Sequence, residues 1–342
     1  MSSVEHEPRD DDLAPRLLEG VEVVEISCSR RAAAAGAALR DLGASVTRVA
    51  VRGERASCGS LDAGKRVVTC GHLAEGDVVG LLDRAEILVE DLDEDPLAVS
   101  TISRRHVHVT VTALGKQQRG HRHRVLTAAE SGLAWDIGIE GRPPMPAPMG
   151  VTESLAGFHA AAAALWLHLQ QLSGAPKRRE ADIAEVDVIG TLLGTHHLLL
   201  RFYGGHYDPE QRPHRGDFGT TLVAGCLVDS AEGSVFVMIA QPSQLERLRK
   251  VMPPPFDEEF PTYRDLIRNQ DSFRRWMQTW AAGRRADELL AEGEQTGFVV
   301  APFLTVPDLA PGGDFPLLRQ DTAGHLEPPA PWQTVSTARS LT

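Results

Sequence analysis

One stretch of the chain combines a carboxylate and an imidazole in a setting that suits covalent or acid–base chemistry. Its loop at 142–148 contains four prolines and cannot be helical, because proline lacks a backbone donor and fixes φ. Thr152 and Glu153 follow, and they open an apolar, alanine-rich run that reaches Leu172. Thr is a favoured N-cap residue, and a first-turn carboxylate faces the positive end of the helix dipole. The sequence therefore predicts that Glu153 is held at the start of a buried helix.

The imidazole lies upstream, in the segment HRHR at 121–124, which leads into a helix predicted over 125–137. Because an imidazole titrates near neutral pH, His123 could carry a proton to or from a substrate. Each residue also has a simpler interpretation. His123 would then be a solvated member of a basic segment, and Glu153 a first-turn helix carboxylate without chemistry.

The elements before this stretch alternate between strand and helix. Strands are predicted at 20–27, 45–51, 66–69, 85–90 and 106–112, with helices at 30–42 and 75–84. This order predicts an α/β fold with an open, Rossmann-like parallel sheet. No GxGxxG follows the first strand, so the fingerprint of dinucleotide-binding proteins is absent.

The second half of the chain predicts a smaller α+β domain. A short strand at 180–185 leads into a helix at 186–202, and a polar loop follows at 203–220. Two strands are predicted within 221–240, joined by a turn at 231–233. Helices at 243–250, 263–269 and 272–295 and a last strand at 297–301 complete this half.

The composition of the chain argues against a nucleic-acid-binding protein and against a membrane-spanning one. A net charge of −12 and a pI near 5.5 argue against nucleic-acid binding. No run approaches the roughly 20 apolar residues that span a membrane. The four cysteines form no CxxC and the histidines show no metal-ligand spacing, so a reduced cytoplasmic setting without a metal is expected. Residues 1–15 are charged, without apolar periodicity, and are expected to be disordered.

Several segments in order carry a family resemblance. They are GVEVVEIS and DLGASVTRV, GKRVVT at 64–69, AEILVED at 85–91, HVHVTVTALG at 106–115, VTESLAGFHAAAAAL at 151–165 and TGFVVAPF at 296–303. Together they resemble the family III CoA-transferases, or CaiB/BaiF family, which includes formyl-CoA transferase and α-methylacyl-CoA racemase. The resemblance implies a large Rossmann-like domain at 16–205 and 300–342 and a small domain at 215–299. It also implies an interlocked homodimer that acts on a small-molecule substrate.

The resemblance also implies roles for particular residues. In the transferases an Asp at the position of Glu153 attacks an acyl-CoA thioester, and Gly157 matches the glycine that follows it. Glu is one methylene longer than Asp, and a displacement of about 1 Å can cost roughly 100-fold in rate. The racemases pair that Asp with a His nine residues before an SG dipeptide, which gives His123. They also use a Glu at the position of Gln241, and an amide cannot ionise.

Binding of CoA is the other implied property. Lys65 and Arg66 match cationic positions near the CoA phosphates, although such a pair is also a common solvated turn. The segment that contacts the adenosine reads EDLDEDP at 90–96, where four acids follow Glu90. Acids beside a phosphate repel it, so CoA binds differently here or the ligand is not free CoA.

Three functions stay open from the sequence. The first is a CoA-transferase that moves CoA between carboxylic acids, with Glu153 as nucleophile. The second is an acid–base enzyme on the same fold (a racemase, dehydratase, isomerase or cyclase) on a CoA, carrier-bound or CoA-free substrate, with His123 and Glu153. The third is a non-catalytic member of the family, because a fold alone does not establish a function.

Overall fold

The computed structural model describes residues 17–51, 58–73, 75–91, 107–116, 124–137, 143, 145, 147–148, 150–174, 180–193, 223–313, 317–320, 324 and 326–327. The chain divides into two compact units. Unit 1 comprises Met1–Ala134, Pro146–Gly194 and Asp321–Thr342, and unit 2 comprises Trp135–Met145 and Thr195–Gln320. This division assigns residues 300–320 to unit 2, and the domain limits expected from the sequence stay a prediction.

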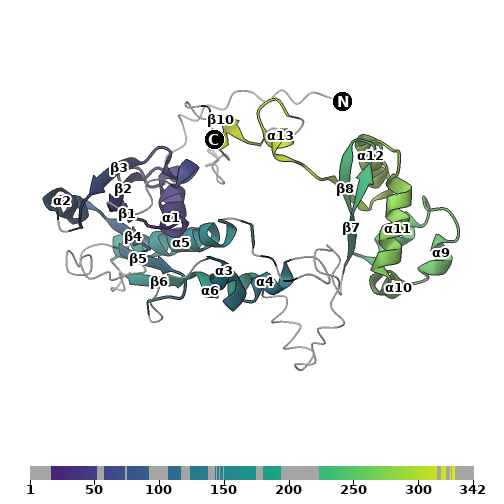
Figure 1. Cartoon of the computed structure of the whole chain (residues 1–342), viewed down its shortest axis with the longest axis horizontal. Helices are drawn as coiled ribbons and strands as arrows, with labels where there is room; N and C mark the ends of the chain where they lie inside the picture. Colours follow the sequence, from purple (N-terminus) through teal and green to yellow (C-terminus); the bar gives the residue numbers. More distant parts are fainter. Residues whose placement is uncertain are drawn as a thin grey trace, which may run out of the picture. The chain divides into compact units, whose positions relative to one another are not determined.

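Unit 1 is built on a six-stranded sheet whose strands are all parallel, as predicted (Figure 1). The strands are β1 (Glu22–Ile26), β2 (Ser45–Val51), β3 (Arg66–Cys70), β4 (Ile87–Glu90), β5 (Val107–Thr112) and β6 (Glu180–Ala184). Their spatial order is β3-β2-β1-β4-β5-β6, so the direction of the chain reverses between β1 and β4. In open parallel sheets this switch point, at the carboxyl ends of the strands, is the usual place for a ligand.

Two helices cover one face of this sheet and pack closely against each other. They are α1 (Arg30–Asp41) and α5 (Val151–Leu172), whose alanines share one core cluster with β1, β4 and β5. A Cβ on Gly157 would lie 2.4 Å from the carbonyl oxygen of Arg31 and 2.7 Å from the Cβ of Ala34. Gly157 is therefore required for the close approach of α5 to α1.

The remaining helices of this part are short. They are η1 (Gly59–Asp62), α2 (Gly76–Arg84) on the opposite face of the sheet, α3 (Arg124–Glu130), α4 (Leu133–Asp136) and α6 (Glu185–Leu192). The single helix predicted over 125–137 is wrong, because Gly132 takes a left-handed φ of 85° and ends α3. The helix predicted over 186–202 begins at Glu185 and ends at Leu192, and residues 194–202 lie outside the described part of the chain.

The start of α5 also differs from the prediction. Thr152 is not the N-cap: the helix begins at Val151, and Gly150 precedes it with a φ of 82°. A left-handed φ favours glycine over threonine, so the backbone geometry rather than a side-chain cap sets the helix start. Thr152 and Glu153 both lie in the first turn and are buried.

Unit 2 has the predicted α+β pattern. Its antiparallel sheet has the order β7-β8-β9, with β7 (Ala224–Ser230), β8 (Gly233–Ile239) and β9 (Val299–Pro302). The helices are α8 (Pro242–Leu248), α9 (Phe256–Glu259), α10 (Tyr263–Arg268), α11 (Gln270–Ala281), α12 (Ala286–Thr296) and α13 (Val306–Leu309). The helix predicted over 272–295 is two helices, because Gly283 takes a φ of 72° between them. The two-residue strand β10 (Arg319–Gln320) ends unit 2, and the two-residue strand β11 (Leu326–Glu327) belongs to unit 1.

None of the helices in the described part of the chain is both long enough and apolar enough to cross a bilayer.

Candidate active site

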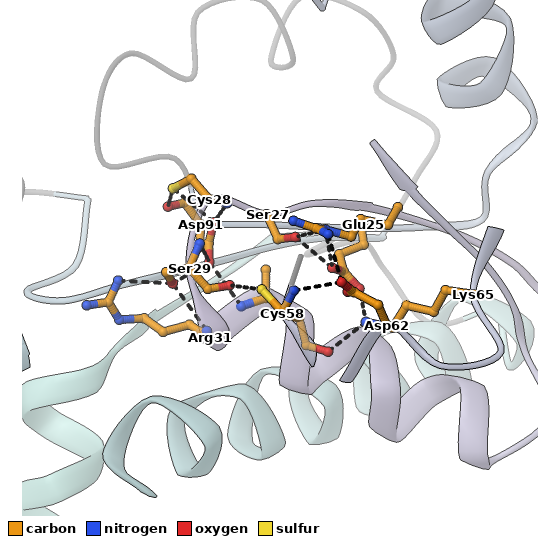
Figure 2. A network of polar contacts seen from close by, with 12 residues as sticks. Glu25, Ser27, Cys28, Ser29, Arg31, Cys58, Asp62, Lys65 and Asp91 are labelled. Carbon is orange, nitrogen blue, oxygen red and sulfur yellow. Dashed lines mark hydrogen bonds and ion pairs between the residues drawn. The ribbon is translucent and has the colours of Figure 1, made fainter. Parts of the chain in front are cut away.

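Asp91 fills the N-terminus of α1 at the switch point of the sheet (Figure 2). Its carboxylate accepts hydrogen bonds from the backbone N–H of Cys28 (2.7 Å), Ser29 (3.0 Å) and Ala32 (3.2 Å), and from the Ser29 hydroxyl (2.5 Å). Burial raises the pKa of Asp91, and the hydrogen bond from Ser29 is the largest opposing effect. A helix N-terminus at this place binds phosphate in dinucleotide-binding proteins. Here the protein's own carboxylate takes the position of that anion.

A buried ion-pair network lies beside it, formed by side chains of β1, β2, η1 and the residue that precedes β3, and most of its members are labelled in Figure 2. Lys65 Nζ is 2.5 Å from Glu25 Oε2, with both side chains fully buried. Arg48 donates to Asp62 at 2.9 Å and to the Ser27 hydroxyl at 2.9 Å. Burial raises the pKa of Glu25 and lowers that of Lys65, while the attraction between them opposes both shifts. The network fixes four charges in the interior of unit 1.

This network bears on the residues expected to hold the CoA phosphates. The ammonium of Lys65 points inward, donating also to the carbonyl of Ala33 at 2.8 Å. Arg66, the next residue, is exposed at the start of β3. A role for either residue in binding phosphate stays a prediction, and of the two Arg66 has its side chain open to solvent.

Glu153 lies in the first turn of α5, on the row of residues that faces α1. The residue is 9% exposed. No hydrogen bond or ion pair joins its carboxylate to any other described residue, yet the carboxylate oxygens are not among the fully buried unpaired atoms. The stem is therefore packed while the carboxylate reaches solvent at the helix N-terminus. That arrangement holds a carboxylate in one place and leaves it able to react.

A second buried ion pair approaches the same end of α1 and α5. Arg31 Nε is 2.6 Å from Glu185 Oε2, and the exposed fractions of the two side chains are 2% and 0%. Glu185 starts α6 directly after β6, and its other oxygen, Oε1, is buried without a hydrogen-bond partner among the described residues. Sequence reasoning missed this pair. The signal was a charged residue at the carboxyl end of a predicted strand, which is where parallel sheets place functional groups.

The acidic segment after β4 is partly internal. Glu90 is fully buried and its Oε1 lies 2.7 Å from His108 Nε2 on the neighbouring strand β5. Asp91 caps α1, as described above. Two of the five acids in this segment are thus bound within the fold, and the other three lie outside the described residues.

Roles for the other two predicted site residues stay predictions. His123 lies outside the described residues. Gln241 belongs to unit 2, where it is exposed and immediately precedes α8; its backbone N–H donates to the Gln244 side chain at 3.1 Å. In the described part of the chain, no group of three His, Cys, Asp or Glu side chains could hold a metal ion.

Comparisons with known proteins agree with the fold and with the resemblance noted in the sequence. A CAIB/BAIF family protein from Brucella suis has a TM-score of 0.75 and 17% identity, covering 93% of this chain and 92% of that chain. The structure of Rv3272 from M. tuberculosis in an orthorhombic form has a TM-score of 0.71 and 18% identity, covering 94% of each chain. No curated protein matched the sequence.

The two structures share the fold at low identity, so the family rests on a separate comparison. The family model described as CoA-transferase family III matches residues 74–315, which is most of the chain and includes Glu153 and Gln241. The chain therefore belongs to CoA-transferase family III.

Proposed function

We propose that this protein moves CoA between two carboxylic acids, with Glu153 as the nucleophile. Membership of the family supports an acyl-CoA transferase at the level of enzyme class. The observation that carries the finer proposal is the state of Glu153: buried along its stem, unpaired among the described residues and open at its carboxylate.

The proposed reaction has two halves that mirror each other. The Glu153 carboxylate attacks the thioester carbonyl, which forms a mixed anhydride and releases the CoA thiolate. The thiolate attacks the Glu153 carbonyl, which forms an enzyme thioester and releases the first acid. A second acid attacks this thioester and releases the thiolate, and the thiolate then attacks the acyl carbonyl of the new anhydride. The second acid leaves as its CoA thioester and Glu153 is restored. Covalent capture of this kind divides one difficult step into easier ones.

The helix N-terminus supports each step electrostatically. The positive end of the α5 dipole stabilises the ionised carboxylate and the oxyanion that forms when its carbonyl is attacked. Gly157 contributes by allowing α5 to pack against α1, which fixes where the first turn of α5 lies.

The internal contacts of two acids weaken one objection to a CoA ligand. The acidic segment at 90–96 was the main reason to doubt a free CoA ligand. Glu90 and Asp91 turn inward and are bound to His108 and to the α1 N-terminus. The repulsion expected from this segment is therefore reduced to the acids at 93–95.

A homodimer forms part of the same proposal. The side of α5 that faces away from α1 presents a row of exposed apolar side chains: Val151, Phe158, Trp166, Leu169 and Leu172. Exposed apolar surface of this length on one helix is typical of an interface. The mass of the protein in solution, measured by light scattering, tests this part.

The nucleophile is tested by following oxygen atoms. Wild-type protein is incubated with a panel of acyl-CoA thioesters and with acetate, succinate or benzoate labelled with oxygen-18. Because the acceptor's oxygen becomes part of the anhydride with Glu153, each turnover brings one oxygen-18 into the Glu153 carboxylate. The labelled peptide is identified by mass spectrometry. Glu180, an exposed acid on β6, serves as the internal control and stays unlabelled.

Substitutions of Glu153 give a second test of its role as nucleophile. Glu153→Gln removes the nucleophile and is expected to lower turnover by roughly 10³-fold or more. Glu153→Asp keeps the carboxylate on a shorter stem and retains part of the activity. Transfer without label in Glu153, or undiminished transfer in Glu153→Gln, contradicts the proposal. Solvent deuterium appearing at Cα of the acyl group, without transfer, would indicate the acid–base alternative instead.

A further inference from the structure

We propose that Arg30 binds the carboxylate of the free acid substrate and holds it beside Glu153. This proposal rests on the proposed role of Glu153 and names a positioning residue for its reaction partner.

The position of Arg30 comes from the start of two helices. Arg30 is the first residue of α1, and its side chain lies against Gly150, the residue that precedes α5. A Cβ built on Gly150 would be 2.5 Å from Arg30 Nε and 3.2 Å from Arg30 Cζ. Glu153 follows Gly150 by three residues, in the first turn of α5. The guanidinium is thus placed next to the turn that carries the proposed nucleophile.

The charge of Arg30 is the feature that needs an explanation. Neighbouring cations are neutralised by buried carboxylates: Arg31 by Glu185, and Lys65 by Glu25. Arg30 forms no ion pair with any described residue, and its Nε is fully buried without a hydrogen-bond partner there. A buried donor without an acceptor is costly, so its acceptor is expected to arrive with a ligand.

The chemistry of the proposed reaction supplies such an acceptor. Each half-reaction has a free carboxylate either leaving Glu153 or attacking it. A guanidinium presents a planar fork of N–H donors that matches a carboxylate in two places. Arg30 and Glu153 are not paired with each other, so a substrate carboxylate can bind Arg30 while it approaches the Glu153 carbonyl. The phosphates of CoA lie at the far end of the pantetheine arm from the thioester, which favours the carboxylate over a phosphate as the ligand.

A chemical labelling experiment tests the binding directly. Phenylglyoxal reacts with accessible, unpaired guanidinium groups, and the modified arginines are identified by peptide mass spectrometry. We expect Arg30 to be modified readily, and formate, acetate, succinate and benzoate are each added to find an acid that slows the reaction several-fold. Arg84, exposed at the end of α2, should be labelled at the same rate with or without the acids. Labelling of Arg30 that none of these acids slows would overturn the proposal, whatever is found at Glu153.

Kinetics separate this role from a structural one. Arg30→Gln should raise the KM for the acid by about 10- to 100-fold while changing the KM for the thioester by less than about twofold. Arg30→Lys should recover part of the loss, and Arg84→Gln should have no effect. If Glu153 of the wild type is labelled but Arg30→Gln leaves the KM for the acid unchanged, the proposed role of Arg30 is wrong and that of Glu153 stands. If transfer occurs without label in Glu153, the proposed function is wrong. The phenylglyoxal experiment with and without the acids then still decides whether Arg30 binds an acid.

Discussion

Substitution of Gly36 by alanine should destabilise unit 1, although alanine is normally the better helix residue. Gly36 lies inside α1, above the buried pair of Glu25 and Lys65. A Cβ at this position would be 1.9 Å from Glu25 Oε2 and 3.1 Å from Lys65 Nζ. Real Cβ atoms essentially never approach within 3.0 Å of another heavy atom. The carboxylate must therefore move by about 1 Å or more, which separates it from its partners.

The magnitude follows from two opposing contributions. Breaking a buried ion pair costs about 3–5 kcal/mol, because it leaves uncompensated charge in the interior. Replacing glycine by alanine inside a helix contributes about 1 kcal/mol in the other direction. We expect a net loss of about 2–4 kcal/mol in the free energy of unfolding, measured by urea denaturation followed by circular dichroism.

Two controls make this test specific. Gly80 lies inside α2, and a Cβ there would have only an ordinary contact, 3.8 Å from Arg84. Gly80→Ala should therefore stabilise the protein by up to about 1 kcal/mol. In a background that carries both Glu25→Ala and Lys65→Met, Gly36→Ala should cost nothing, because the pair it displaces is gone. Gly36→Ala at wild-type stability would refute the inference that Glu25 and Lys65 form a close pair beneath α1.

Two further predictions concern buried groups. Asp91→Ala leaves the N–H groups of Cys28, Ser29 and Ala32 without their acceptor. The free energy of unfolding, measured in urea, should therefore fall by about 2–4 kcal/mol. A fall of less than about 0.5 kcal/mol would contradict the capping role of Asp91. Burial raises the pKa of Cys226 from 9.0 to about 12, so the unfolded chain ionises first as the pH rises and stability is lost between these values. At pH 10 this loss is about 1.4 kcal/mol relative to pH 7, and a Cys226→Ala variant should lack it when the two proteins are unfolded in urea at both pH values. A parallel fall with pH in both proteins would show that Cys226 is not its cause.

The sheet of unit 1 was predictable because its signals are local. Buried parallel strands are runs of β-branched residues, and the charged or glycine-containing segments between them mark where each run ends. Helix boundaries were less predictable. The breaks at Gly132 and Gly283 depend on left-handed φ values, and an isolated glycine in a helical pattern is often tolerated. Glycine at 150 likewise replaced the expected cap at Thr152.

The ion pairs of unit 1 could not be predicted, because they join distant parts of the chain. Arg31 and Glu185 are 154 residues apart, and Lys65 and Glu25 are 40 residues apart. A sequence without an alignment shows each of these charges alone, and a lone charge is most often a solvated surface group. Both interpretations weighed for Lys65 assumed an exposed side chain, whereas its ammonium is buried against Glu25.

Most of the buried charges around the parallel sheet are bound to other groups of the protein. Asp91 is bound to the α1 N-terminus, Arg31 to Glu185, and Lys65 to Glu25, so none of these charges is free to recognise a substrate without first breaking an internal bond. Because such bonds are buried, exchanging one for a ligand would cost about as much as the ligand contact provides. Glu153 and Arg30, by contrast, have no ion-pair partner among the described residues and flank the same turn of α5. In the proposed transfer between two acids, Glu153 supplies the carboxylate that reacts and Arg30 the guanidinium that holds the acid.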